Sequence, residues 1–171
     1  MTRKRPDDAG GTGAASGGVL PLDAFARAAT GHRRLIGIDL GDKRIGLALS
    51  DVTRTIASGL TTLPRGKFAG DAARLLALAS EHGVGGFVIG LPVRLDGSHG
   101  RRAQATRAYA ANLARLTPLP LLLWDERLST VAAERTLLAA DASRRRRAEV
   151  IDKVAATLIL QGALDRLKRF P

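Results

Sequence analysis

Four acidic residues stand where the hydrophobic pattern predicts buried elements to end or begin, and they could do chemistry together. Asp39 lies at the end of the apolar run RLIGIDL, Asp125 and Glu126 close LPLLLWDE, and Asp152 lies near the start of the last predicted helix. Carboxylate oxygens from separate elements are the ligands that a hard, octahedral cation such as Mg²⁺ prefers. The chain has no cysteine, which excludes thiolate ligands, and its three scattered histidines argue against a zinc site.

The elements that must position these acids alternate between strands and helices from residue 33 onward. We expect, in chain order, strands at 34–40, 45–51 and 57–63, a helix at 68–83, a strand at 86–90, a helix at 101–116, a strand at 119–126, a helix after Ser129 or Thr130, and a last helix that follows the loop ASRRRRAE. Short links make the first three strands an antiparallel meander. Right-handed crossovers then place the fourth and fifth strands parallel to the first.

The expected fold class is therefore α/β, with a mixed five-stranded sheet and helices on both faces. Functional sites in such sheets gather at the carboxyl ends of the central strands. Asp39 lies at the end of the first strand, and Asp125 and Glu126 lie at the end of the fifth. The pattern thus predicts a cluster of carboxylates drawn from distant parts of the chain.

The chain is predicted to form one folded domain, residues 33–171, preceded by two short segments. Residues 1–18 are rich in Gly, Ala and Asp without an apolar period and are predicted to be a disordered tail. Residues 19–32 are an N-terminal extension that could include a short helix at 19–29. No apolar run reaches the length of a membrane span, and the N-terminus lacks the apolar core of a secretory signal. We therefore expect a cytoplasmic protein without a membrane partner.

The charge of the chain points to a polyanionic partner. There are 27 Lys and Arg residues against 16 Asp and Glu residues, a net charge of +11. A domain this basic attracts nucleic acid. The alternative is that the excess reflects genome composition, because 22 of the 27 basic residues are Arg in an Ala-rich chain.

Four motifs carry a resemblance to a known family. GIDLGDKRIGLALSD, VIGLPVRLDGSHGRRA, DERLST and IDKVAATLILQGAL occur in this order over residues 33–168, and together they resemble the YqgF/RuvX family. Its members are Holliday junction resolvase-like proteins, regarded mainly as nucleases that mature the 5′ end of the small-subunit rRNA precursor. The resemblance implies a ribonuclease-H-like fold. It also implies catalytic roles for Asp39, for one acid of the Asp125–Glu126 pair, and for Asp152.

Phosphodiester hydrolysis explains why three carboxylates would be needed. Two Mg²⁺ or Mn²⁺ ions about 3.5–4 Å apart can generate the attacking hydroxide and stabilise the leaving oxygen. Alternation along a strand sends Asp125 and Glu126 to opposite faces. We expect Glu126 to be the metal ligand with Asp39 and Asp152, and Asp125, the alternative ligand, to pair with Arg127. Alternatively, Asp39 could stabilise the turn that follows it, and Asp152 could interact favourably with the dipole at the start of its helix.

Basic residues near the predicted site are candidates for binding substrate phosphates. They lie in the turn after the first strand and in loops flanking the site, and they are Lys43, Arg44, Arg101, Arg102, Arg144, Arg145, Arg146 and Arg147. The alternative is an ordinary solvated run of charge.

Other functions remain open at this point. The substrate could be structured precursor rRNA or branched DNA, because phosphate contacts do not read the sugar or the sequence. A basic nucleic-acid-binding protein without catalysis would show the same charge, and the oligomeric state, monomer or homodimer, is open. GIDLGDK is also similar to the phosphate-binding hairpin of actin-like ATPases, but the chain has one copy of it and those enzymes need two half-domains.

Overall fold

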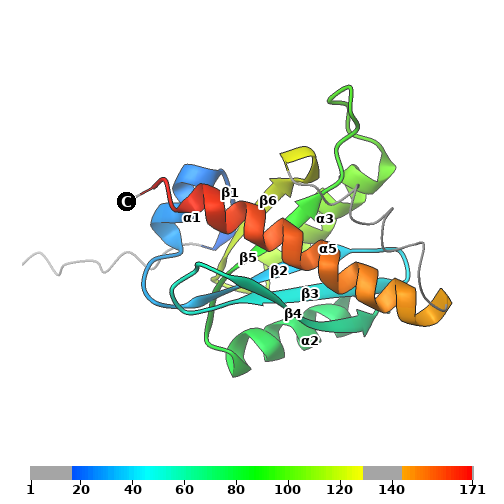
Figure 1. Ribbon diagram of the computed structural model, residues 1–171, viewed down its shortest axis with the longest axis horizontal. Helices are drawn as coiled ribbons and strands as arrows, with labels where there is room; N and C mark the ends of the chain where they lie inside the picture. Colours follow the sequence, from blue (N-terminus) through cyan, green and yellow to red (C-terminus); the bar gives the residue numbers. More distant parts are fainter. Residues whose placement is uncertain (1–16, 129–143, 171) are drawn as a thin grey trace, which may run out of the picture.

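A single mixed β-sheet forms the centre of the protein. The computed structural model describes residues 17–128 and 144–170, and describes side chains in the C-terminal part from residue 148 onward. The strands are β1 (Gly18–Leu20), β2 (Arg34–Leu40), β3 (Arg44–Ser50), β4 (Ala57–Pro64), β5 (Val84–Leu91) and β6 (Pro120–Asp125). They lie side by side in the order β1-β6-β5-β2-β3-β4 (Figure 1). The predicted antiparallel meander is β2-β3-β4, and β5 and β6 run parallel to β2.

The sheet has six strands, so the expectation of five was wrong. The additional strand, β1, pairs in parallel with β6 at the edge of the sheet, with Val19 opposite Leu121. It has only three residues and no alternation of polar and apolar side chains, so nothing in its sequence distinguishes it from a loop. The strand order also departs from the chain order, because the helical connections carry β5 and β6 to the side of β2 that the meander leaves open.

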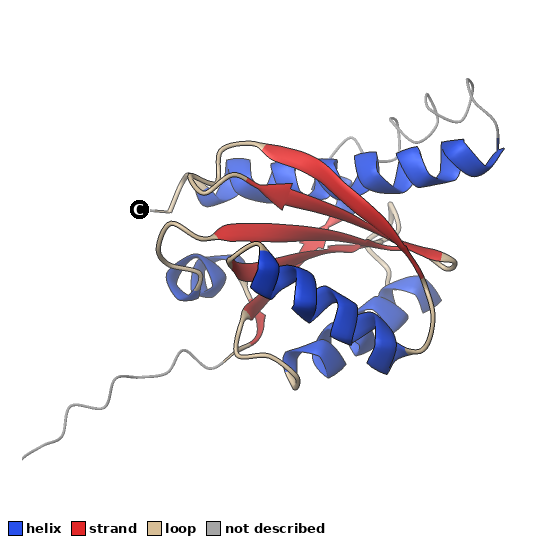
Figure 2. Ribbon diagram, turned by 90° about the horizontal axis from the view of Figure 1, so that it is seen from below, coloured by secondary structure: helices blue, strands red, loops and turns tan. Residues whose placement is uncertain are grey.

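Helices cover both faces of the sheet, as predicted (Figure 2). They are α1 (Leu22–Ala28), α2 (Phe68–Glu81), α3 (Arg101–Ala114), the 3₁₀ turn η1 (Glu126–Leu128) and α5 (Arg144–Leu167). The long helix α5 crosses one face, and α2 and α3 lie on the other. Gly83, at a φ of +63°, follows the end of α2 and is a typical glycine at the C-terminal end of a helix. Within the described ranges, no helix has the length and apolarity needed to cross a membrane.

Helix α5 begins earlier than the sequence pattern indicated. Arg144–Arg147 were predicted to lie in a loop, but their backbone is helical and opens α5. Long Arg side chains are good helix formers, so a basic run can start a helix without an apolar period. Asp152 consequently lies in the third turn of α5 and not in the first. The helix that was predicted after Ser129 or Thr130 falls outside the described residues.

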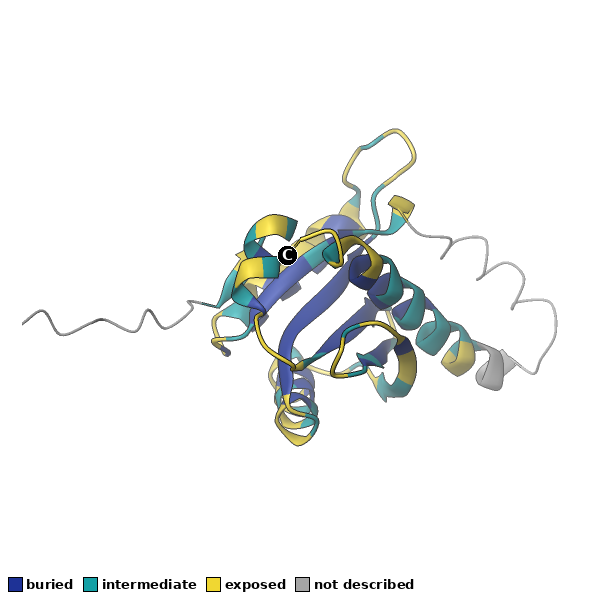
Figure 3. Cartoon of the chain, turned by 60° about the vertical axis from the view of Figure 1, so that its left-hand side comes forward, coloured by how far each residue is buried: buried dark blue, intermediate teal, exposed yellow. Residues whose placement is uncertain are grey.

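Two hydrophobic clusters form the core, one on each face of the sheet. Along β2, Ile36 and Ile38 pack with the side chains of α2 and α3, whereas Leu35 packs with those of α5. This is the alternation expected of a strand that is covered on both sides. Figure 3 shows the central strands as buried over most of their length. Alternate residues of a central strand therefore face α5 or face α2 and α3.

The loop between β3 and β4 is closed by the carboxylate of Asp51. Its Oδ1 accepts hydrogen bonds from the backbone N–H groups of Ile56 (3.0 Å) and Thr55 (2.7 Å), and the Thr53 hydroxyl donates to the other oxygen. These hydrogen bonds lower the pKa of Asp51 to about 2, and the hydrogen bond from the Ile56 backbone has the largest effect.

This pKa predicts how the loop responds to acid. Because the pKa in the folded protein lies below the ordinary value of 3.8, the stabilisation by Asp51 is complete above about pH 4 and is lost as the pH falls through about 2. We expect the Asp51 carboxyl carbon to titrate near pH 2 by NMR. A midpoint near 4 would mean that the hydrogen bonds do not persist, and Asp51→Asn should remove this part of the pH dependence of unfolding.

Candidate active site

Asp39 is a buried acid on the face of the sheet that α5 covers. It lies two residues after Gly37, where a Cβ would come within 2.6 Å of the Leu160 Cβ of α5. Residues two apart on a strand share a face, so the Asp39 side chain also points toward the α5 side. Its exposed fraction is only 3%. An acid that is buried at the end of a central strand is where the sequence analysis placed a functional group.

Asp152 reaches the same place because α5 packs directly on a glycine of β3. Gly46 is the register partner of Asp39. A Cβ on Gly46 would clash with the backbone oxygen of Asp152, and it would lie 2.5 Å from its carbonyl carbon and 3.0 Å from its Cβ. The absence of a side chain at Gly46 thus sets Asp152 beside Asp39, although 113 positions separate the two in the sequence.

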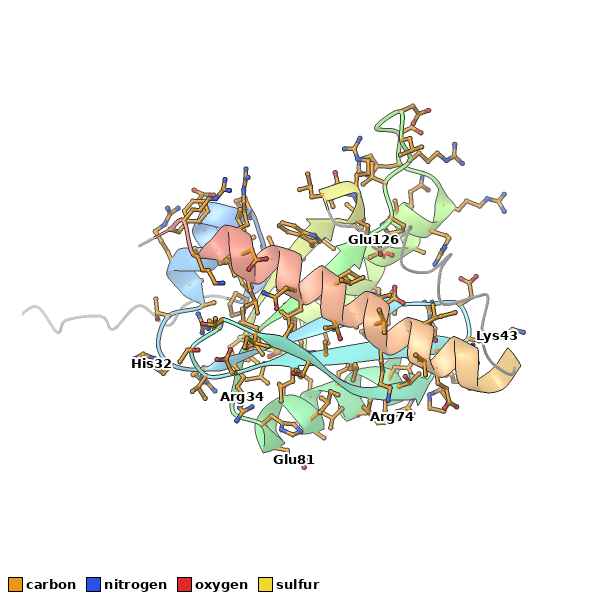
Figure 4. The ribbon with its side chains drawn as sticks, viewed as in Figure 1. His32, Arg34, Lys43, Arg74, Glu81 and Glu126 are labelled. Atoms are coloured by element: carbon orange, nitrogen blue, oxygen red, sulfur yellow. The ribbon has the colours of Figure 1, made fainter. Side chains whose placement is uncertain are left out.

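Glu126 approaches Asp39 from the opposite side, over a glycine of β5. Ile38 pairs with Ile89, so the next residues along the two parallel strands, Asp39 and Gly90, are neighbours. A Cβ on Gly90 would lie 2.7 Å from the Glu126 Oε1. Figure 4 shows Glu126 toward the end of the molecule from which Lys43 projects, whereas Arg34 and His32 lie at the other end. Asp39 is therefore flanked by two glycines, with Asp152 over one and Glu126 over the other.

Asp125 faces away from this group. Its carboxylate binds the guanidinium of Arg127, with Nη2 to Oδ2 at 2.7 Å and Nε at 3.1 Å from each oxygen. This pairing was predicted and is confirmed. The hydrogen bonds from the Arg127 side chain lower the pKa of Asp125. Asp125 lines a hollow of about 410 Å³ with His99 and Arg107 on the α3 side of β6. The strand predicted to run to residue 126 ends at Asp125, and Glu126 begins η1, so the chain turns between the two acids and only Glu126 lies over β5 beside Asp39.

The three acids on the α5 face are not gathered around a common point. Among the residues that the structure describes, no group of three or more His, Asp or Glu side chains is arranged to hold a metal ion. The Asp152 carboxylate instead accepts a hydrogen bond of 3.0 Å from Nε of Arg44. In donor chemistry the set still fits a hard divalent cation, because it offers only carboxylate oxygens. The helix dipole does not account for Asp152, since its effect fades within the first turn.

The basic residues predicted to bind substrate lie around the same end of the sheet. Lys43 is in the β2–β3 turn, Arg44 opens β3, and Arg101 and Arg102 open α3. The side chains of Arg144–Arg147 fall outside the described residues.

Arg101 and Arg102 line two adjoining hollows, which bring in two arginines that sequence reasoning missed. The first hollow, about 460 Å³, also has Arg94 in its wall. The second, about 210 Å³, also has Arg65, whose Nη1 donates to the Gly41 oxygen at 2.7 Å. Arg94 belongs to the motif VIGLPVRLDGSHGRRA, so the sequence could have identified it as a candidate. Arg65 lies in none of the four motifs, and nothing in the sequence was a reason to choose it.

Comparison with known proteins places this chain in a family. The model of the RuvX family, described as a Holliday junction resolvase, matches residues 33–166. A protein of Bradyrhizobium sp. (strain BTAi1), named "Putative pre-16S rRNA nuclease", is 59% identical over 149 residues, which are 87% of this chain and 92% of the relative. A protein of the same name from Paramagnetospirillum magneticum is 60% identical over 138 residues, covering 81% and 89% of the two chains.

The fold also has a counterpart among solved structures. RuvC of T. thermophilus in complex with a Holliday junction substrate superimposes with a TM-score of 0.51 and 13% identity, over 80% of this chain and 97% of that one. At this identity the likeness concerns the fold: a mixed α/β sheet similar to that of RuvC.

Proposed function

Since the chain belongs to the RuvX family, we propose that it is a divalent-metal-dependent nuclease that hydrolyses phosphodiester bonds during 5′ maturation of precursor 16S rRNA. The observation that carries this proposal is Asp39 between Gly46 and Gly90, with Asp152 and Glu126 over the two glycines. The names of the bacterial relatives support the substrate, and the ribonuclease-H-like fold supports the chemistry. A cytoplasmic location follows from this substrate.

Each acid has a defined part in the proposed mechanism. Asp39, Glu126 and Asp152 would hold Mg²⁺ or Mn²⁺, and the bound ions would supply the attacking hydroxide and stabilise the leaving oxygen. Asp39 is the fixed member, because it is buried in a central strand. Asp152 is carried by a helix whose backbone rests on Gly46. The ion pair with Arg127 keeps the Asp125 side chain on the other face, and there we assign it the structural role of stabilising the end of β6.

The substrate-binding part of the proposal rests on the arginines at this end of the sheet. Lys43, Arg44, Arg101, Arg102 and Arg144–Arg147 are proposed to contact phosphates of the RNA, with Arg65 and Arg94 added from the structure. In the described part of the chain, Arg65, Arg94, Arg101 and Arg102 form no ion pair with a carboxylate. Guanidinium groups without ion-pair partners, lining two adjoining hollows at the end of β2 where Leu40 and Asp42 lie, suit phosphate binding.

Substrate binding should become less dependent on salt when these arginines are removed. We expect the double variant Arg101→Gln/Arg102→Gln to reduce the slope of log K against log[salt] by about one unit for each arginine. The measurement is RNA binding by fluorescence anisotropy between 50 and 200 mM salt. Arg115→Gln is the matched control, because Arg115 follows the far end of the same helix and is exposed. Equal slopes for the double variant and the wild type would remove these residues from the interface.

The experiment that tests the function compares two substrates under one condition. A second candidate activity, resolution of branched DNA, is favoured by the description of the family model as a Holliday junction resolvase. A precursor 16S rRNA fragment and a four-way DNA junction should be incubated with the protein at fixed salt and Mg²⁺. We expect cleavage of the RNA and little of the junction. Cleavage of the junction alone would favour the second activity, and cleavage of neither would overturn the assignment as a nuclease.

A further inference from the structure

Arg44 forms an ion pair with one of the three proposed metal ligands. Its Nε lies 3.0 Å from Oδ2 of Asp152, and the two side chains are 31% and 18% exposed. Arg44 is the first residue of β3, two positions before Gly46. Both residues therefore face α5, and the guanidinium approaches Asp152 along the strand.

The backbone of Asp152 has little freedom to move, but its carboxylate can turn. The helix rests on Gly46, where even a Cβ would come within 2.5 Å of the Asp152 carbonyl carbon. With the Cβ of Asp152 held in this way, rotation of the side chain decides its partner. Arg44 lies two positions before Gly46 on β3, and Asp39, the register partner of Gly46, lies on the neighbouring strand β2.

This geometry explains why the acids of the site are near one another without forming a cluster. Carboxylates brought together in a partly buried site repel, and an opposite charge nearby offsets the repulsion. The guanidinium of Arg44 supplies one positive charge to the Asp152 carboxylate. A divalent cation would supply two positive charges, and it would need the same carboxylate as a ligand.

We propose that Arg44 is a positioning residue that competes with the divalent cation for Asp152. It holds the Asp152 carboxylate while the metal site is empty and loses this partner when the cation binds. The inference rests on the proposed function, since it assumes that Asp152 is a metal ligand. The released guanidinium is then available to a substrate phosphate, so that metal and substrate favour each other's binding, and this coupling is reciprocal.

Mn²⁺ titrations followed by electron paramagnetic resonance test the competition without requiring cleavage. Arg44→Gln is expected to tighten Mn²⁺ binding about two- to fivefold, the range that corresponds to loss of a partly exposed ion pair. In an Asp152→Asn background the same substitution should tighten Mn²⁺ binding no more than Lys43→Gln does in the wild type, because Arg44 and Mn²⁺ no longer share the Asp152 carboxylate. Lys43→Gln is the matched control. It removes a charge from the neighbouring position, and at 0.15 M salt it should change the affinity less than Arg44→Gln does.

The outcomes separate this inference from the proposed function. Equal Mn²⁺ affinity for Arg44→Gln and the wild type, or an equal gain in the Asp152→Asn background, would overturn the competition and leave the nuclease proposal standing. A wild-type protein that binds no Mn²⁺ would overturn both. NMR provides a readout without mutation: the Arg44 Nε–H resonance should shift when Mg²⁺ is added, and an unchanged resonance at saturating Mg²⁺ would contradict the release of Arg44.

Discussion

The Asp39→Asn variant is expected to cleave a precursor 16S rRNA fragment at least about 100-fold more slowly than the wild type. Loss of a residue that supports a metal ligand already costs about 10- to 100-fold, so loss of a ligand itself should cost no less. Asparagine has nearly the same size and shape as aspartate, so it fits a position that is 3% exposed. The measurement is a single-turnover cleavage rate at saturating Mg²⁺, with circular dichroism to confirm folding.

Asp23→Asn is the control for this experiment. Asp23 is an exposed acid of α1 that pairs with Arg27 at 3.0 Å, on a helix that takes no part in the proposed site. Its variant loses the same charge and should keep the wild-type rate. A rate for Asp39→Asn within about threefold of the wild type would contradict the assigned mechanism.

Gly46→Ala is expected to lower the free energy of unfolding by about 3 kcal/mol and to abolish cleavage. The new methyl group would clash with the backbone of Asp152, and a backbone cannot turn aside as the end of a side chain can. Helix α5 must shift away from β3, which moves Asp152 away from Asp39. Urea unfolding and the cleavage assay measure the two effects.

Gly59→Ala is the matched control, because Gly59 of β4 also lies under α5. A Cβ there would lie 3.5 Å from the Cβ of Lys153, an ordinary van der Waals contact. We expect its stability to remain within about 1 kcal/mol of the wild type and its activity to be retained. Similar losses in both variants would show that the close approach at Gly46 is not what positions Asp152.

Local sequence patterns predicted most of the fold and part of the arrangement of acids at the site. The strands and helices follow from hydrophobic periodicity, the meander from its short links, and the two parallel strands from right-handed crossovers. Asp125 and Glu126 were predicted to point in opposite directions, although the structure achieves this by a turn that begins at Glu126. The pairing of Asp125 with Arg127 could be predicted because the two residues are two positions apart. These predictions use only local patterns and the lengths of the links between elements.

Other features depend on contacts that no local pattern contains. The ion pair between Arg44 and Asp152 joins residues 108 positions apart, and Arg65 meets Arg101 and Arg102 only in the folded protein. Strand β1 is stabilised by its pairing with β6, and its own three residues have no pattern that predicts a strand. The start of α5 at Arg144 was missed because a run of arginines has no apolar face to reveal a helix.

In the proposed mechanism the carboxylates on the α5 face carry the reaction, and their neighbours on the other face do not. Glu126 and Asp125 offer the most direct test, because they are adjacent in sequence and lie on opposite faces of the sheet. The measurement is the cleavage rate of a precursor 16S rRNA fragment in Mg²⁺ by Glu126→Gln and by Asp125→Asn. We predict a loss of at least about 100-fold for Glu126→Gln and a rate within about threefold of the wild type for Asp125→Asn. The reverse result, an active Glu126→Gln and an inactive Asp125→Asn, would show that Glu126 is not a metal ligand.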